Sequence, residues 1–162
     1  MGITVTMRTD GHAQQKLRAM AMRARSPEKA WPKVGSYLSA VNRRQFATNG
    51  GYLGTPWKPL KPDYLLWKVR EGYSSHTLIQ TGAMRLSFTS RPMAIEVYSG
   101  NKARFGSDHP LAAFHQRGTH RNGKRAVPAR PIMRVTPKVR KDVKDIIADY
   151  ILGKRVTVMD RL

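Results

Sequence analysis

The short stretch between residues 108 and 120 holds the residues best suited to bind a metal ion. Asp108, His109, His115 and His120 offer the carboxylate and imidazole groups that zinc accepts as ligands. The histidines are six and five residues apart, which matches neither a helical i,i+4 pair nor a known zinc-binding pattern. His109 and His115 would also face different sides of a short helix. We therefore expect structural or solvent-facing histidines here, with no metal ion and no cofactor.

The acidic residues give no clear sign of general acid–base catalysis, which needs a pair of carboxylates or a histidine–acid couple in a cleft. Ten acids are scattered along the chain, and Asp142, Asp145 and Asp149 have the spacing of one polar helix face. There they would pair with nearby lysines. The chain also lacks a Gly-x-Ser-x-Gly motif, a P-loop and a dinucleotide-binding fingerprint. We do not expect an enzyme, although a nuclease with dispersed ligands remains compatible with the pattern.

Residues 112–136, AAFHQRGTHRNGKRAVPARPIMRVT, are crowded with arginine and lysine and contain no acid. Such side chains bind phosphate groups or acidic protein surfaces. The residues that we expect to contact nucleic acid or a neighbouring protein are Arg117, Arg121, Lys124, Arg125 and Arg130. The expected basic loop lacks aromatic residues on which single-stranded bases could stack. The simpler alternative is a solvated loop without a partner.

The charge of the whole chain points the same way. Thirty Lys and Arg residues stand against ten Asp and Glu residues, a formal net charge of +20. A field of that sign attracts polyanions, so nucleic acid is the favoured partner, with an acidic protein face as the alternative. There is no cysteine, which excludes disulfides and thiolate metal sites and fits a reducing cytosol. We expect neither a transmembrane segment nor a signal peptide, because no long apolar run is present.

The hydrophobic periodicity predicts a single α+β domain over residues 1–162: an antiparallel β meander sheet packed with N-terminal helices and a C-terminal amphipathic helix. Loops at 50–62 and 117–127 are expected to be flexible, and the C-terminal residues 153–162 are expected to form either a loose tail or a terminal strand. In the last helix we expect Thr136 as N-cap, Pro137 at the first position and Gly153 at the end. Strands are expected at 3–9, 84–91, 93–100, 102–108 and 130–136, and helices at 12–25, 26–49, 62–72, 74–83, 110–117 and 137–152.

Four motifs follow one another in an order that resembles the virion morphogenesis, or tail-completion, family of tailed phages. The resemblance covers about residues 40 to 150, and four motifs in order are more specific than any one of them. The matching residues are Gly54, Trp57, Pro59 and Leu60; Leu78, Thr81, Gly82, Met84 and Ser87; His115, Gln116 and Gly118; and Pro128, Ala129, Arg130 and Ile132. The chain departs from the family pattern at Asp63-Tyr64 and Ala113-Phe114, so a tail-completion, tail-terminator or neck role stays open.

The resemblance implies a non-enzymatic structural subunit of the virion, made in the host cytoplasm and placed in the tail or neck. It implies a homo-oligomer, a hexameric ring, around the DNA channel. The implied partners are the tail tube or tail terminator, head connector proteins and the phage DNA, without a membrane. The alternative is a basic nucleic-acid-binding domain that works alone.

Most motif residues have positions that suit packing and turns more than direct contact with a partner. In particular, Gly82 is expected to stop a helix before a strand. The residues expected to maintain the fold are Trp57, Pro59, Leu60, Thr81, Gly82, His115, Gln116, Gly118, Pro128 and Ala129. The basic loop at 117–125 has little packing material, so we expect it to be an interface.

Overall fold

Helix α2, Trp31–Ala47, runs through the centre of the molecule. The computed structural model describes residues 11–162, apart from the side chains of Arg121, Lys124, Arg125 and Met159. The other elements are α1 (Gly11–Arg25), α3 (Pro62–Arg70), α4 (Ala83–Thr89), β1 (Ile95–Ser99), β2 (Lys102–Gly106), α5 (Ala112–Arg117), β3 (Thr119–Arg121), β4 (Lys124–Val127) and α6 (Pro137–Leu152), with short 3-10 helices at Pro27–Ala30, Gly51–Leu53 and Met159–Arg161. The predicted α+β class is confirmed, while the expected strand at 3–9 lies outside the described residues.

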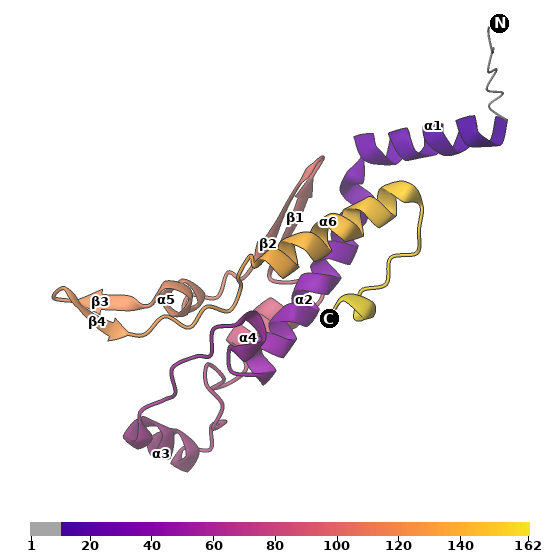
Figure 1. The fold of residues 1–162 in the computed structure, drawn as a ribbon. Helices are drawn as coiled ribbons and strands as arrows, with labels where there is room; N and C mark the ends of the chain where they lie inside the picture. The colour runs from indigo at the N-terminus through magenta and orange to yellow at the C-terminus, as the bar shows by residue number, and fades with distance from the viewer. Residues whose placement is uncertain (1–10) are drawn as a thin grey trace, which may run out of the picture.

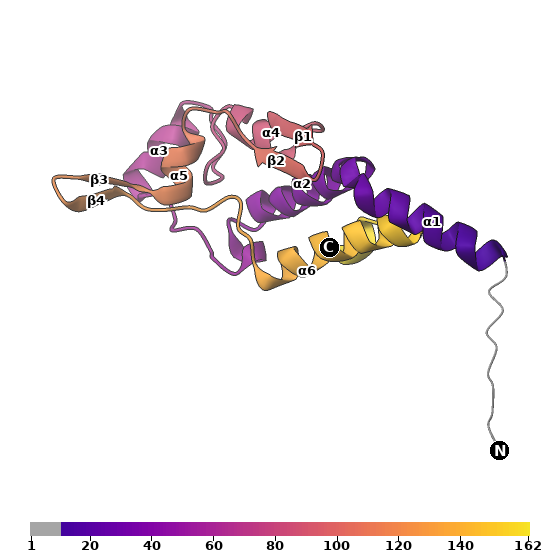
Figure 2. The same cartoon turned by 90° about the horizontal axis from the view of Figure 1, so that it is seen from above.

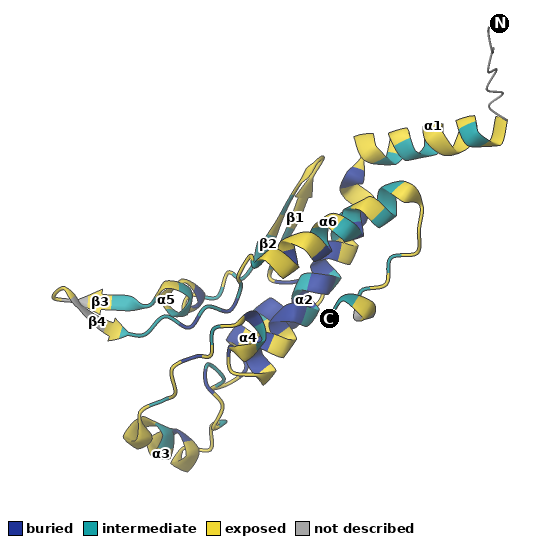
Figure 3. Ribbon diagram, in the orientation of Figure 1, coloured by how far each residue is buried: buried dark blue, intermediate teal, exposed yellow. Residues whose placement is uncertain are grey.

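The molecule is elongated, with elements that project from both ends of a central body. Helix α1 extends from one end, and α3 and the β3–β4 hairpin extend from the other (Figure 1). Seen from above, α2 and α6 run side by side and β1–β2 flanks α2 (Figure 2). Buried residues concentrate in α2 and α4, whereas α1 and α3 are largely exposed (Figure 3).

Two hydrophobic clusters share α2. In the first, Val34, Tyr37 and Val41 of α2 pack against Val139 and Ile146 of α6. In the second, Phe46 at the end of α2 meets residues from four other segments: Trp57, Met84, Phe88, Ala112 and Ile132. The apolar stripe expected along the last helix is confirmed, since it is the face that packs against α2. Thus one helix connects segments that are otherwise far apart in the chain.

A row of polar side chains on α2 is also buried, and each finds a hydrogen-bond partner outside the helix. Ser39 Oγ donates to the carbonyl of Thr89 at 2.7 Å, and Asn42 Nδ2 donates to the carbonyl of Phe88 at 3.1 Å. Gln45 donates to the carbonyl of Pro131 at 3.1 Å and accepts from the backbone N–H of Leu53 at 2.9 Å. These bonds satisfy carbonyls at the C-terminal end of α4 and at Pro131 and the N–H of Leu53, which would otherwise be costly to bury.

The expected strand at 84–91 and the expected helix at 74–83 are both wrong. Residues 83–89 form α4, and its buried residues Met84 and Phe88 have the i,i+4 spacing of one helix face. In so short a run, the same two positions also fit the alternation of a strand, so the pattern does not distinguish a helix from a strand. Upstream, Leu78 has φ of 62°, a left-handed conformation that interrupts a helix. Gly82, with φ of 89°, comes directly before α4 and starts a helix instead of ending one.

The expected β meander is also wrong, because the described residues form two separate two-stranded hairpins. The strands expected at 93–100 and 102–108 are confirmed as β1 and β2, joined at Gly100-Asn101. The strand expected at 130–136 does not form. Its backbone is held by the side chain of Gln116, which accepts from the N–H groups of Ile132 and Met133 and donates to the carbonyl of Met133. Pro131 has no N–H for a β ladder.

Helix α6 begins and ends where the sequence predicts. The Thr136 side chain accepts from the N–H of Val139 at 3.2 Å, and Gly153 follows the helix with φ of 71°. Beyond it, the chain folds back, and Val156, Val158 and Leu162 pack on the first cluster. Arg161 pairs with two aspartates of α6. The C-terminal residues therefore cover α6 in this structure.

A buried hydrogen bond between α2 and α6 makes the stability depend on pH. Tyr37 Oη donates to Asp142 Oδ2 at 2.6 Å, and Lys138 Nζ donates to the same oxygen at 2.8 Å. Burial raises the pKa of Asp142, but the hydrogen bonds from Lys138 and Tyr37 outweigh it and hold the pKa below its ordinary value. Because the folded-state pKa is depressed, the carboxylate stabilises the fold fully above about pH 4, and this contribution is lost as the pH falls through the folded-state pKa.

We predict that Asp142→Asn lowers the free energy of unfolding at pH 7 by about 2 kcal/mol, since hydrogen bonds to a charged group are lost. The free energy of unfolding of the variant should also fall less between pH 7 and acid pH than that of the wild type, because the asparagine does not titrate. Urea unfolding at pH 7 and at steps down to about pH 2 measures both effects. Asp108→Asn, at an exposed aspartate, is the control and should change neither. An unchanged acid profile in Asp142→Asn would contradict the assignment.

Candidate interaction surfaces

Helix α3 has the reverse of the usual polarity for a surface helix. Leu66 is 70% exposed, and Trp67 and Val69 are exposed beside it, whereas Lys68 is only 2% exposed. Helices at the surface of a globular protein normally turn their apolar side inward. A cluster of exposed apolar side chains on a projecting helix is typical of a surface that another molecule covers. We name this surface, made of Tyr64, Leu66, Trp67, Val69 and Tyr73, the α3 face.

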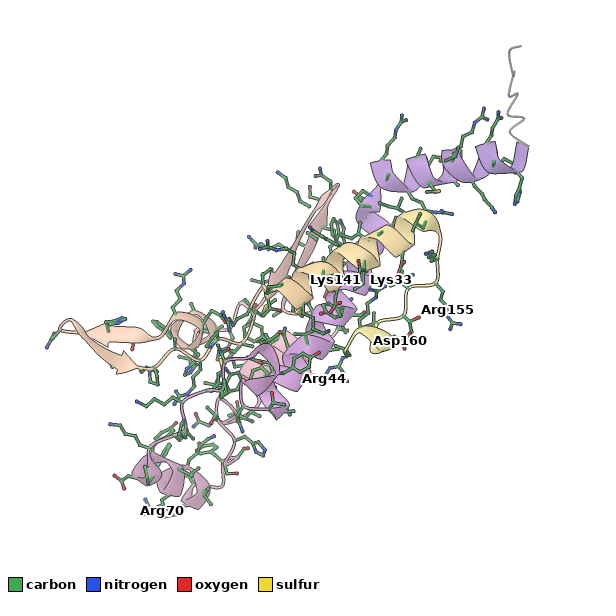
Figure 4. All side chains as sticks on the ribbon, in the orientation of Figure 1. Lys33, Arg44, Arg70, Lys141, Arg155 and Asp160 are labelled. Atoms are coloured by element: carbon green, nitrogen blue, oxygen red, sulfur yellow. The ribbon has the colours of Figure 1, made fainter. Side chains whose placement is uncertain are left out.

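The aromatic residues of the α3 face contact one another. The rings of Tyr64 and Trp67 are stacked with centroids 5.4 Å apart, and Tyr73 lies 6.1 Å from Trp67. Pro62 occupies the start of the helix, where its missing N–H costs nothing. Arg70 lies at the outer end of α3 (Figure 4). Preordered, partly exposed aromatic side chains bordered by arginine are the composition that protein interfaces favour.

The β3–β4 hairpin forms the second projecting element, where the sequence had predicted a loop. Asn122 and Gly123 make its turn, with φ of 52° and 71°, as the Asn-Gly pair indicates. In the register of the hairpin, Arg121 is opposite Lys124 and His120 is opposite Arg125. Arg117 is exposed at the end of α5, next to the hairpin. We name residues 117–127 the basic arm: this stretch contains no acid and holds four of the five predicted basic contact residues, Arg117, Arg121, Lys124 and Arg125.

Arg130, the fifth residue of that set, is not on the basic arm. Only 7% of it is exposed, and its guanidinium donates to the carbonyl of Lys58 at 2.9 Å and that of Pro59 at 3.3 Å. Its direction follows from Pro131 and from the hydrogen bond between its own N–H and the carbonyl of His115, which hold this segment against α5. Arg130 is therefore placed to hold the 58–59 loop and is buried, whereas Arg117 is exposed.

The family-motif residues occupy several kinds of position. Trp57 is buried, packs edge-on against Phe46 at 5.4 Å and donates to the carbonyl of Pro131 at 2.9 Å. Pro59 and Thr81 are exposed, Gly82 is buried, and Leu60, His115, Gln116, Gly118, Pro128 and Ala129 are half-buried. Their placement beside α5, α4 and the loop before α3 brings all four motifs around the second hydrophobic cluster.

The histidines do not form a metal site among the described residues, where no three His, Asp or Glu side chains gather. His115 has a buried Nδ1 that has no hydrogen-bond partner. Burial lowers the pKa of His115, and the nearby charges of Arg130 and His109 lower it further. His115 is therefore neutral at pH 7, and the charge in its neighbourhood comes from Arg130.

The α3 face and the inward Lys68 are features that the sequence analysis missed. A signal was present: five of the nine residues of α3 are Tyr64, Leu65, Leu66, Trp67 and Val69. A short helix that is apolar on more than one side needs cover on more than one side. The domain covers Lys68 and part of Leu65, whereas Leu66, Trp67 and Val69 remain exposed.

The fold defines a class of protein: a small α+β protein with a narrow core, from which a helix with exposed apolar side chains and a hairpin of basic sequence project. The family model for the phage virion morphogenesis family matches residues 9–152, so the chain belongs to that family. Membership supports a structural role in the phage virion more than a catalytic one. Among the described residues, no helix is both long and apolar enough to cross a membrane.

Two curated relatives extend the comparison. The chain is 35% identical over 92 residues to Mu-like prophage FluMu G protein 2 of Haemophilus influenzae, a match that covers 56% of this chain and spans 60% of the length of that protein. It is 29% identical over 106 residues to an uncharacterised protein of Methanocaldococcus jannaschii, with 61% of this chain and 70% of that protein covered. No solved structure matches the chain significantly.

We predict that Gly118→Ala destabilises the fold far more than Gly123→Ala. Both glycines have positive φ, of 75° and 71°, so both variants are strained. At Gly118 the added Cβ would also lie 2.8 Å from the backbone nitrogen of Ala129, whereas nothing lies within 4 Å at Gly123. The expected losses in free energy of unfolding are about 3 kcal/mol and about 1 kcal/mol. Urea unfolding measures them, and equal losses would refute the close contact between α5 and residue 129.

We predict that Leu66→Asp leaves the free energy of unfolding within about 0.5 kcal/mol of wild type, because the side chain is already in water. The same change at the buried Leu53 should unfold much of the protein, since it places a charge in the first cluster. Leu66→Asp should also reduce the fluorescence of a dye that binds exposed apolar surface. Thermal unfolding and dye titration measure the two effects, and a large destabilisation by Leu66→Asp would show that the α3 face is internal.

Proposed function

We propose that this chain is a structural subunit that completes the tail or joins head to tail in a tailed phage, by assembling with copies of itself into a ring, for which we expect six-fold symmetry. The family match and the Mu-like prophage relative support its virion setting. The ring and the position at the tail end or neck are our proposal. Its partners would be the tail tube or tail terminator and the head connector, with phage DNA in the channel.

The α3 face is the observation that carries this proposal. Leu66 and Val69 are exposed, while the only buried residue of α3 is a lysine. Apolar surface removed from water contributes about 25 cal/mol per Å², so covering this face on assembly is favourable. A free monomer gains no stability from keeping this apolar face in water. A subunit that covers the face against a neighbour gains free energy when it assembles.

Helix α1 offers a second surface at the opposite end of the molecule (Figure 1). It has no buried residue, and Leu17 and Met22 are exposed. Arg23 of α1 donates a hydrogen bond to the carbonyl of Ile151 in α6 at 3.1 Å. A helix of fifteen residues is only marginally stable in water without packing. Rings built by head-to-tail contacts need two different surfaces on each subunit, and α1 and the α3 face fulfil that requirement.

We predict that particles contain this chain in a ring, and that Leu66→Asp prevents its incorporation although the variant folds. Electron microscopy of particles from phage carrying wild-type or variant chain gives the position and the copy number. Leu86→Asp is the matched control, because Leu86 is an exposed leucine on α4, away from the α3 face. Absence of the chain from finished particles, or normal incorporation of Leu66→Asp, would overturn the proposal.

The basic arm supports a second candidate, a nucleic-acid-binding domain that works alone. Arg117, Arg121, Lys124 and Arg125 carry this alternative, because no acid lies between residues 119 and 127. The two candidates respond oppositely to salt. Duplex binding through phosphates weakens with a slope of about −0.9 per neutralised phosphate against log salt, whereas apolar subunit contacts persist. Light scattering and duplex binding at several salt concentrations separate them: salt-stable oligomers favour the ring, and salt-sensitive tight binding by a monomer favours the alternative.

A further inference from the structure

A cavity of about 750 Å³ lies between the loop before α3, residues 78–84, the start of α5 and strand β4. Its volume falls in the range of about 300–1,000 Å³ that is usual for binding sites. Leu60, Leu78, Ile79, Met84, Leu111 and Val127 line much of it. This wall is suited to an apolar occupant, and it lies inward of the α3 face, since Tyr64 and Lys68 of α3 also line it.

Two buried cations border the cavity. Lys68 is 2% exposed, and its Nζ donates to the carbonyls of His76 and Ile79, at 2.6 and 2.5 Å. Arg130 is buried too, and its guanidinium donates hydrogen bonds to the carbonyls of Lys58 and Pro59. An ammonium has three donors and a guanidinium five, so both groups retain donors beyond those that the carbonyls use. Burial lowers the pKa of Lys68 and of Arg130.

No acid neutralises these cations. The residues that line the cavity include no Asp or Glu, and within the part of the chain that the structure describes neither Lys68 nor Arg130 forms a salt bridge. His115, also in the lining, is turned neutral by its surroundings and keeps a buried Nδ1 without a partner. Buried charges in proteins are normally paired, because an unpaired one is costly.

We propose that this cavity is a docking site for a segment of another virion protein that carries a carboxylate next to apolar side chains. The carboxylate would lie by Lys68 and Arg130, and the apolar side chains would cover Leu78, Ile79 and Met84. The positive charge of the cavity wall favours an anion. The apolar part of the wall favours apolar side chains next to that anion, which a nucleic-acid phosphate or a free inorganic anion does not carry. The virion origin of the segment rests on the proposed function; the chemistry of the site does not.

The test uses the full-length protein and the peptide acetyl-Leu-Ala-Leu, with a free C-terminal carboxylate or as the C-terminal amide. We expect the acid to bind at least about tenfold more tightly than the amide, the usual effect of one charge-assisted hydrogen bond. Arg130→Gln should remove the difference between acid and amide. Lys102→Gln, which removes one positive charge at an exposed position of β2, should preserve it. Calorimetric titration measures the affinities.

A second measurement holds even if Arg130→Gln fails to fold. In the wild-type protein, the acid peptide should shift the amide resonances of residues 78–84 and 126–130. Equal affinity for acid and amide, or shifts located elsewhere, would overturn the site. Binding of dodecanoate or inorganic phosphate without binding of the peptide would overturn the protein origin of the occupant. If the peptide binds as expected and the chain is missing from particles, the site stands and the virion function fails.

Discussion

The whole molecule depends on α2, because this one helix contributes to both hydrophobic clusters. It also carries three buried polar side chains, each of which must find a hydrogen-bond partner. Its first half packs on α6, while Phe46 closes the second cluster. Ser39, Asn42 and Gln45 hold the end of α4 and the loops at residues 53 and 131. A change on this row would leave buried carbonyls unsatisfied in segments remote from one another in sequence.

This arrangement explains how so slender a body can carry projecting elements. The hairpin and α3 have few contacts of their own with α6, yet the segments at their bases, at residues 57 and 131, meet at α2 through Trp57 and Gln45. The fixed bases set the directions of α3 and the basic arm. The outer surface of α3 can then remain exposed without cost to the core.

Predictions from the sequence succeed where the signal is local. Thr136, Pro137 and Gly153 bound α6 because capping depends on immediate neighbours. They fail where a distant side chain decides. The amide of Gln116 takes the hydrogen bonds that would have paired residues 132 and 133 in a sheet. The left-handed Leu78 replaces an expected helix with turns, and no propensity at that position indicates it.

The candidate site divides in the same way. The turn of the β3–β4 hairpin follows from the sequence, because Asn122 and Gly123 adopt the positive φ angles that an Asn-Gly pair favours. Arg130 lies in the same basic stretch of sequence, but its side chain is buried. Pro131 and the hydrogen bond from the N–H of Arg130 to the carbonyl of His115 turn this segment inward. The buried Lys68 depends on which side of α3 meets the domain. That is a property of packing, and the sequence of α3 alone does not determine it.

Both hairpins stop at two strands in the described part of the chain, so each has outer edges whose backbone groups lack a ladder partner. Such edges invite addition of a strand from any neighbouring polypeptide. Lys102 and Arg104 in β2, and the arginines and lysine of β3 and β4, are residues that discourage indiscriminate edge pairing. The positive charge of this chain therefore disfavours pairing between the strand edges of separate copies of the chain.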